Sequence, residues 1–428
     1  MTTEGRLTRD LPQILGDLAM GPYPDYIDDV LATSATIRQR PAWTFPERWL
    51  PMVDLVRQPV LVPRLPWRSI VLALVVLLAI LAAAIIYVGS QQRLPAPFGP
   101  ARNGVIAYDA GGDIYTADPV SGRASAVITG LETDVGPRFS LDGTHLAFAR
   151  MADGGRSQIY VARSDGSGLT LVTPTPITLV TGDSGRGWER YKFSPDGREL
   201  LIATVSGITI ARTDGSGVTD LDVGMPAAEP TFRPPDGREI LFIGRGTDAG
   251  LFIFDRTTNQ SHQIVRMNPN FDLAGANWSP DGSKVAYWTW DNNTEGLTAK
   301  THIVNADGTV DRELPSPPGA VWNAHATWSN DGKRLFLARG YTSGEDDVRG
   351  FVVPADGSGP GVQIAPAGSV ETGCCAAWLW SPDDSELLGR PTALGNGVPM
   401  VVLNAAGGAV RTAPMNAISD PTWQRLAP

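Results

Sequence analysis

The chain has 428 residues, 42% of them hydrophobic, and a formal net charge of −10 at pH 7. A chain this acidic is a poor ligand for polyanions, which argues against a nucleic-acid-binding protein. Only two cysteines are present, so the fold does not depend on a framework of disulfides.

Residues 1–68 predict a short helical segment with two amphipathic helices, the second over residues 26–40. Its apolar side chains recur at helical spacing and form one stripe, which consists of Tyr26, Ile27, Val30 and Leu31. Two short helices cannot bury a core by themselves, so the stripe is expected to contact a cytoplasmic protein or the bilayer. Anionic lipids would repel Asp25, Asp28 and Asp29, which favours a protein.

Residues 69–89 are predicted to form a transmembrane helix. Within this segment, 19 consecutive residues comprise 13 Ile, Leu or Val, five Ala, one Tyr and no charged residue. About 20 apolar residues are needed for a helix to cross the hydrocarbon core. Three arginines, at positions 57, 64 and 68, precede the segment, and two, at positions 93 and 102, follow it. The positive-inside rule then places the N-terminus in the cytoplasm and the rest of the chain outside.

A linker is expected over residues 90–102, and a repeated phrase begins beyond it. The phrase is Phe or Trp followed by Ser-Pro-Asp-Gly, and it is intact at Phe193 and Trp278. Its aromatic residues stand 39 to 54 residues apart and comprise Phe139, Phe193, Phe232, Trp278, Trp328, Trp380 and Trp423. A period of about 40–50 residues with many short strands is typical of β-propeller blades.

The Pro-Asp-Gly part of the phrase predicts a tight turn between two strands of one blade. Proline cannot donate a ladder hydrogen bond, and Asp-Gly favours a turn with positive φ. The aromatic residue is expected to end the first strand and to fill the layer between neighbouring blades. The turn aspartates of the six repeats are Asp142, Asp196, Asp236, Asp281, Asp331 and Asp383.

The two ends of the repeat array complement each other. Residues 104–131 contain apolar runs that match the second, third and fourth strands of a blade, without a first strand. The terminal run Pro421–Trp423 supplies a first strand without the rest. We therefore expect an all-β propeller over residues 103–426, closed by pairing of its two ends, because closure removes exposed sheet edges. Seven blades are predicted, with six as the alternative.

With these phrases, residues 103–425 resemble the TolB-like, WD-like propeller repeats of bacteria. The resemblance implies four-stranded blades around an axis, and it implies no single function. The order of helical segment, span and exterior domain is similar to that of membrane anti-sigma regulators, which implies a sigma factor as cytoplasmic partner. The zinc-binding version of such segments is excluded, because residues 1–68 contain neither His nor Cys. The run from Arg38 to Pro46 is similar to one found in actinobacterial membrane proteins.

No catalytic motif is found along the chain. A nucleophile elbow, an H-E-x-x-H pair, a P-loop and a dinucleotide fingerprint are all missing, and the four histidines fall in different repeats. We therefore expect no metal and no cofactor. His325 precedes a first strand and is placed to face the axis, whereas Arg186, Trp188 and Glu189 lie on an inter-repeat loop suited to recognition.

These features predict a single-pass protein of the plasma membrane whose extracytoplasmic propeller binds a protein, peptide or envelope ligand. Its cytoplasmic segment is expected to bind a regulator such as a sigma factor. One alternative is a propeller enzyme, of the metal-dependent lactonase or lyase type, with a site on the axis. Another is an envelope scaffold without a signalling role. Converging Asp, Glu, His or Asn side chains on the axis would favour the enzyme, and an apolar axis would favour the binding protein.

Overall fold

A computed structural model describes residues 71–78, 98–180, 190–291, 298–342, 347–365, 378–389, 400–408, 410–413, 415 and 420–427. The chain divides into two compact units, Met1–Ser90 and Gln91–Pro428. In the first unit, residues 71–78 are helical and expose their side chains. No helix within the described ranges has the length and apolar character needed to cross a membrane. The rest of the predicted span and both predicted cytoplasmic helices lie outside the described residues.

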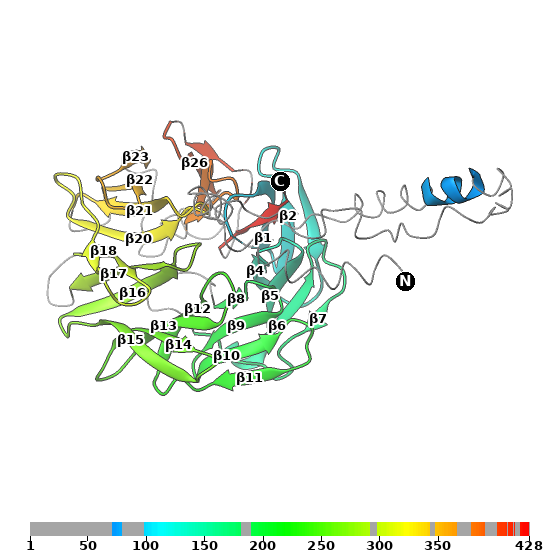
Figure 1. Ribbon diagram of the computed structural model, residues 1–428, viewed down its shortest axis with the longest axis horizontal. Coiled ribbons are helices and arrows are strands. Elements are labelled where there is room, and N and C mark those ends of the chain that lie inside the picture. The colour runs from blue at the N-terminus through cyan, green and yellow to red at the C-terminus, as the bar shows by residue number, and fades with distance from the viewer. Residues whose placement is uncertain are drawn as a thin grey trace, which may run out of the picture. The chain divides into compact units, whose positions relative to one another are not determined.

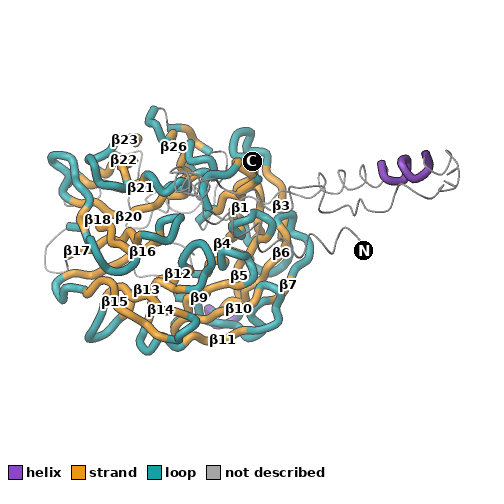
Figure 2. Tube along the Cα trace, in the orientation of Figure 1, coloured by secondary structure: helices purple, strands orange, loops and turns teal. Residues whose placement is uncertain are grey.

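In the second unit, the described residues form seven four-stranded antiparallel sheets. Figure 1 shows these sheets following one another around a ring. Figure 2 shows the strands in orange and the loops and turns that connect them in teal. The prediction of an all-β propeller with seven blades is therefore confirmed, and the alternative of six blades is wrong. In six blades the strands pair in chain order, and in one blade the last strand of the chain pairs with the first.

The strand bounds follow the repeat closely. The blade that joins the two ends consists of β28 (Thr422–Leu426), β1 (Arg102–Ala110), β2 (Asp113–Ala117) and β3 (Ala124–Ile128). The next two blades contain β4 (Asp134–Phe139), β5 (His145–Met151), β6 (Ser157–Arg163) and β7 (Thr170–Leu171), then β8 (Tyr191–Phe193), β9 (Glu199–Thr204), β10 (Gly207–Arg212) and β11 (Val218–Leu221). A short 3-10 turn, η3 (Asp153–Gly155), precedes β6.

The remaining four blades repeat this order. Two of them contain β12 (Ala227–Phe232), β13 (Glu239–Gly244), β14 (Gly250–Asp255) and β15 (Gln260–Arg266), then β16 (Phe271–Trp278), β17 (Lys284–Asp291), β18 (Lys300–Asn305) and β19 (Arg312–Glu313). The last two contain β20 (Trp322–Trp328), β21 (Arg334–Gly340), β22 (Val348–Pro354) and β23 (Val362–Ala365), then β24 (Trp378–Trp380), β25 (Glu386–Gly389), β26 (Val401–Asn404) and β27 (Arg411–Thr412).

The ring is closed by pairing between β28 and β1. Ile106 lies opposite Trp423 in this antiparallel pair, and Arg102 lies opposite Leu426. The indole Nε1 of Trp423 donates to the carbonyl of Gly104 at 3.1 Å, and the Trp423 side chain is buried. This pairing is the one predicted from the incomplete repeats at the two ends, and it is confirmed. It leaves no open edge between the first and last blades.

The repeat aromatics pack between neighbouring blades, as predicted. Phe193, at the end of β8, belongs to one buried cluster with Ala147 and Ile159 of the preceding blade and Leu200 of its own. Trp278 ends β16, and its cluster also takes residues from two adjacent blades. Burial of these aromatic rings therefore stabilises the contact between two blades as well as the sheet to which each ring belongs.

The turn after each aromatic is held by one small set of hydrogen bonds. At Ser194, the hydroxyl donates to Asp196 Oδ1 at 2.6 Å and accepts from the backbone N of Glu199 at 2.9 Å. The N–H of Gly197 donates to the carbonyl of Ser194 at 2.9 Å. The same Ser-to-Asp hydrogen bond recurs in four other repeats, from Ser140, Ser279, Ser329 and Ser381.

The glycine of the turn is required by backbone conformation and by space. Gly143 has a φ of +69°, a backbone conformation that residues other than glycine rarely adopt. A Cβ there would overlap the carbonyl oxygen of Arg425 in the closing strand. One repeat has Asp384 at this position instead, with a φ of +60°. Its carboxylate accepts from the backbone N of Asn330 at 2.7 Å and of Asp331 at 2.8 Å, and these bonds offset the unfavourable backbone.

The turn hydrogen bonds predict how the stability of the propeller changes in acid. Burial raises the pKa of Asp142, but hydrogen bonds from Ser140 and Thr144 outweigh it and hold the pKa below its ordinary value. A carboxyl with a depressed folded pKa stabilises the fold above its unfolded pKa of about 3.9 and loses that effect as the pH falls through the folded pKa. Asp142→Asn should therefore lower the free energy of unfolding by about 1–2 kcal/mol at pH 7, as measured by urea unfolding.

At pH 3 the free energies of unfolding of this variant and the wild type should differ less. The wild-type carboxylate is then becoming protonated, and its stabilising contribution is being lost. Asp153→Asn, which changes one exposed carboxyl in η3, is the matched control and should show no such convergence. A difference at Asp142 that stays constant between pH 7 and pH 3 would contradict the role given to the turn carboxylate.

Candidate ligand-binding site in the axial cavity

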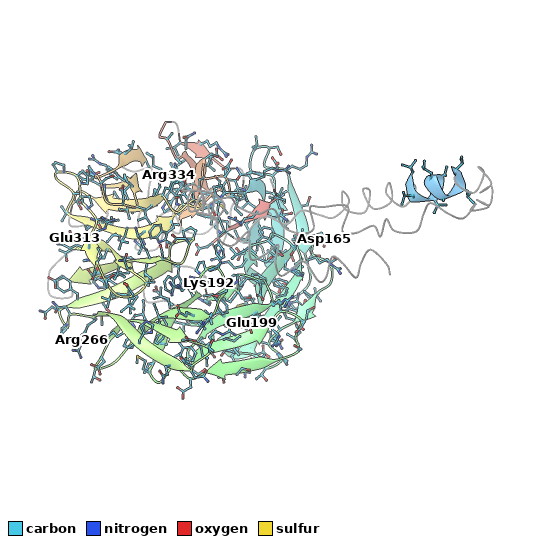
Figure 3. All side chains as sticks on the ribbon, viewed as in Figure 1. Asp165, Lys192, Glu199, Arg266, Glu313 and Arg334 are labelled. Carbon is cyan, nitrogen blue, oxygen red and sulfur yellow. The ribbon has the colours of Figure 1, made fainter. Side chains whose placement is uncertain are left out.

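The first strands of the seven blades surround a cavity of about 410 Å³ on the axis of the ring. We call it the axial cavity, since residues of β4, β8, β12, β16, β20, β24 and β28 all line it. Figure 3 shows Lys192 near the middle of the ring, whereas Arg266 and Glu313 lie at its edge. The volume falls within the range of about 300–1,000 Å³ that is common for small-molecule sites.

One position of the repeat supplies the wall of the axial cavity. The residue just before each repeat aromatic lies on the other face of its strand from the aromatic, because side chains alternate along a strand. In all seven repeats this residue lines the cavity: Arg138, Lys192, Thr231, Asn277, Thr327, Leu379 and Thr422. The position varies from blade to blade, so it carries the individual chemistry of this ring.

A second position, three residues before the aromatic, lies at a β-bulge. In four described first strands its φ is positive: Gly136, Glu229, Gly275 and His325. The register of each of these strands shifts at the same place. A bulge re-aims one side chain, and a non-glycine residue with positive φ marks a constrained position. The carboxylate of Glu229 accepts from the N–H of Gly275 at 2.7 Å, which links two neighbouring bulges.

His325 is the candidate residue from the sequence that lies in the axial cavity. Its φ is +62°, its side chain is buried, and it is among the lining residues. The imidazole lies 5.2 Å from the indole of Trp288, measured between ring centroids. His145 is exposed at the start of β5, and His262 and His302 lie on two other blades.

Charged side chains are present among the described residues that line the axial cavity: Arg138, Lys192 and Arg425 are cationic, and Asp420 is acidic. Arg138 Nη1 donates to the carbonyl of Pro421 at 3.1 Å, and its Nη2 lies 3.8 Å from Asp420 Oδ2. These contacts hold the guanidinium against the closing strand. Burial lowers the pKa of Arg425.

The mouth of the cavity on the side of the Ser-Pro-Asp-Gly turns is formed by the residues two positions after the aromatics. Leu141, Pro195 and Pro280 are examples, and Asn330 takes the place of proline in one repeat. Arg425 Nη1 donates to Asn330 Oδ1 at 2.7 Å, and Arg425 Nη2 donates to the carbonyl of Gly99 at 2.5 Å. The start of the propeller chain is therefore bound at this mouth.

Two indole N–H groups at the cavity have no hydrogen-bond acceptor among the described residues. They belong to Trp278 and Trp378, which are both buried and both line the cavity. In other repeats the indole is satisfied by backbone: Trp328 donates to Asn277 O at 3.2 Å and Trp380 donates to Thr327 O at 2.9 Å. A buried N–H without an acceptor is unfavourable, and neither nitrogen is exposed to the cavity, because each is buried within the protein.

The described residues include only some of the predicted site residues. Tyr26, Ile27, Val30 and Leu31 of the stripe lie outside the described residues, as do Arg186, Trp188 and Glu189. The described turn aspartates accept hydrogen bonds within their own turns. Among the described residues, no group of three His, Cys, Asp or Glu is arranged to hold a metal. Sequence analysis missed Arg138, Lys192 and Arg425. The signal was their place relative to the repeat aromatic, one residue before it for Arg138 and Lys192 and two residues after it for Arg425.

Comparisons with known proteins give the fold and little more. No family model matches the chain. Tricorn protease homolog 1 from Streptomyces coelicolor is 26% identical over 264 residues, which cover 58% of this chain and 22% of that protein. The match thus spans about a fifth of the relative's length.

Among solved structures, an oligogalacturonate lyase in complex with manganese has a TM-score of 0.53 and 18% identity over 73% of this chain and 85% of that one. The GH74 xyloglucanase from Xanthomonas campestris has a TM-score of 0.52 and 12% identity over 78% of this chain and 56% of that one. TolB from Acinetobacter baumannii has a TM-score of 0.46 and 16% identity over 74% and 81%. At these identities the likeness to the lyase and the xyloglucanase shows a shared fold alone.

The two classes of indole predict different responses to the same substitution. Trp278 and Trp380 occupy the same repeat position, and each has an arginine 5.0 Å from its ring centroid, Arg233 and Arg334 respectively. Trp380→Phe removes a hydrogen bond to Thr327 O and should lower the free energy of unfolding by about 1 kcal/mol more than Trp278→Phe. Chemical denaturation of both variants measures this difference. Equal losses, or a larger loss at Trp278, would contradict the difference in hydrogen bonding between the two indole N–H groups.

Proposed function

We propose that the protein is a membrane-anchored, extracytoplasmic propeller that binds a ligand in its axial cavity. The observation that carries this proposal is the cavity itself, to which all seven first strands contribute. Its wall combines aromatic rings with a few charged and hydroxyl groups, as small-molecule and peptide-end sites do. A ligand of protein, peptide or envelope origin fits this description.

Anchoring is proposed from the sequence of residues 69–89. The uncharged run of aliphatic side chains and the arginines that precede it support a single span with the propeller outside the plasma membrane. The linker of residues 90–102 then tethers the propeller close to the bilayer. This topology would expose the axial cavity to ligands of the envelope.

We also propose that residues 1–68 bind a cytoplasmic regulator, for which a sigma factor is the candidate. The stripe of Tyr26, Ile27, Val30 and Leu31 supports this proposal, because each large apolar side chain gains roughly 1.5–3 kcal/mol when it is buried. A partner protein would supply that burial. A ligand bound outside could then be reported to the cytoplasm through one span.

The second candidate function is a propeller enzyme. Asn277, His325 and Asp420 line the axial cavity together, and this is the mixture of side chains that would favour catalysis on the axis. A histidine and a carboxylate can exchange protons with a bound substrate. A metal-dependent lyase of the kind named among the solved structures has less support, because the described residues offer no cluster of three His, Cys, Asp or Glu. The binding role is preferred, because no catalytic motif was found in the sequence.

Protease accessibility tests the proposed topology. In intact spheroplasts, added protease should cleave the propeller or the proline-rich linker and should leave residues 1–68 intact, since the arginine-rich side of the span faces the cytoplasm. Antibodies against the two ends of the chain distinguish the fragments. Permeabilised cells are the control, in which both ends become accessible. Digestion of residues 1–68 with protection of the propeller in intact spheroplasts would refute the orientation and the sensing role.

A further inference from the structure

We propose that residues 98–101 form a strap, held by a latch, across the mouth of the axial cavity on the side of the Ser-Pro-Asp-Gly turns. The latch consists of Arg425, Asn330 and Asp384. The strap is the stretch of chain just before β1, and its first two residues line the cavity. Release of the latch opens this mouth while the ring stays closed. The use of the strap as a gate for a ligand rests on the proposed binding function.

The guanidinium of Arg425 joins the strap to the ring. Its Nη2 donates to the carbonyl of Gly99 at 2.5 Å, and its Nη1 donates to Asn330 Oδ1 at 2.7 Å. Burial lowers the pKa of Arg425, and the carboxylate of Asp384 opposes that shift. Hydrogen bonds from a charged donor are stronger than those between neutral groups. One side chain of the closing strand therefore holds the first residues of the propeller chain.

Two departures from the repeat supply the rest of the latch. The residue after the turn serine is proline in the intact phrases, whereas here it is Asn330. Its side chain accepts from Arg425, which a proline could not do, and its Nδ2 donates to Asp384 Oδ1 at 2.8 Å and to the carbonyl of Ser381 at 2.9 Å. In the next blade, Asp384 stands in place of the turn glycine, despite its φ of +60°. Departures from a local rule are expected at functional sites, and both of these belong to one network that ends at the strap.

The strap has the features of a segment that can lift by itself. Gly99 has a φ of +88°, and a Cβ there would meet no atom within 4 Å, so its position is not fixed by packing. Pro100 is exposed and has no N–H to donate. The N–H of Ala101 donates to the carbonyl of Pro382 at 2.7 Å, and Arg425 holds the carbonyl of Gly99. A short segment held in this way can open locally while the strands behind it stay paired.

Cysteine labelling of the full-length protein in detergent tests the strap directly. In a background of Cys374→Ser and Cys375→Ser, the substitution Ala101→Cys places a thiol on the strap at a buried position. Ala107→Cys is the companion reporter, because Ala107 is buried in β1 opposite Thr422 of the closing strand and is exposed only when the ring opens. The rate of reaction with a maleimide then measures opening at the two places separately.

Substitution of the latch should release the strap and leave the ring closed. Asn330→Leu keeps the backbone N–H and removes the acceptor of Arg425, so the thiol at position 101 should react about tenfold faster, and the thiol at position 107 should react as before. Asn305→Leu is the matched control, since Asn305 is a turn asparagine of another blade whose Nδ2 donates to Thr309 Oγ1 at 3.0 Å. It should leave both rates unchanged.

A second variant changes the strap and leaves the latch intact. Gly99→Ala places a Cβ on a backbone with positive φ and should speed the reaction at position 101 several-fold, because alanine disfavours that conformation by roughly 1 kcal/mol. Gly111→Ala is its control. Gly111 has a φ of +64° and equally open surroundings, but it lies between β1 and β2. It should not affect the thiol at position 101.

A thiol inside the cavity tests the gate. Thr231 lines the cavity and is half-buried, and it lies on β12, in a blade that does not contribute to the latch. The thiol of Thr231→Cys should react faster when Asn330→Leu is also present, because the opened mouth admits the maleimide. Reaction at one rate with and without Asn330→Leu would show that the strap does not control entry, and the gate would be wrong.

Two results would overturn the latch itself. One is an unchanged rate at position 101 in both Asn330→Leu and Gly99→Ala. The other is equal acceleration at positions 101 and 107, which would mean that the ring opens and not the strap alone. None of these measurements uses a ligand, so their failure leaves the proposed function standing. That function fails separately, on the orientation measured by proteolysis.

Discussion

The pairing of β28 with β1 is the contact on which the rest of the propeller depends. It joins residues more than three hundred positions apart, at Ile106 and Trp423, and turns a row of blades into a ring. The axial cavity exists because the ring is closed, and the closing strand also supplies Thr422 and Arg425 to its wall. The hydroxyl of Thr422 accepts from the backbone N of Phe139 at 3.2 Å, so the closing strand also holds the next blade. Closure of the ring therefore also completes the wall of the axial cavity.

The repeat separates what is constant in the ring from what is individual. The Ser, Asp and Gly of each turn and the aromatic before them build the blade, and their hydrogen bonds recur almost unchanged, as at Ser194 and Ser279. The residue before the aromatic has no part in these contacts and is free to vary. It is Arg138, Lys192 and Leu379 in three of the repeats, and all three residues line the axial cavity. Departures within the turn itself, such as Asp384, bring their own hydrogen bonds as compensation.

The fold was accessible from the sequence because its signals are local and repeated. A turn with Asp-Gly and an aromatic at a regular period are read without knowledge of distant contacts, and the incomplete repeats at the two ends implied closure. The site was harder, because it is assembled from one residue of each blade. The place of His325 shortly before a repeat aromatic indicated the axis, whereas no sequence motif marks Lys192. The absence of a described acceptor for the indole of Trp278 depends on details of packing that no sequence pattern conveys.

Hydrogen exchange of the closing strand tests the central claim most directly. In the full-length protein, the backbone amides of β28 (Thr422–Leu426) should exchange at the slow rate of the paired part of β1 around Ile106, because both open only when the ring opens. Protection of about 10³ or more is expected for both segments in native buffer, and mild denaturant should abolish it in both at once. Rapid exchange of residues 422–426 while β1 remains protected would contradict closure by this pair, and with it the account of the axial cavity.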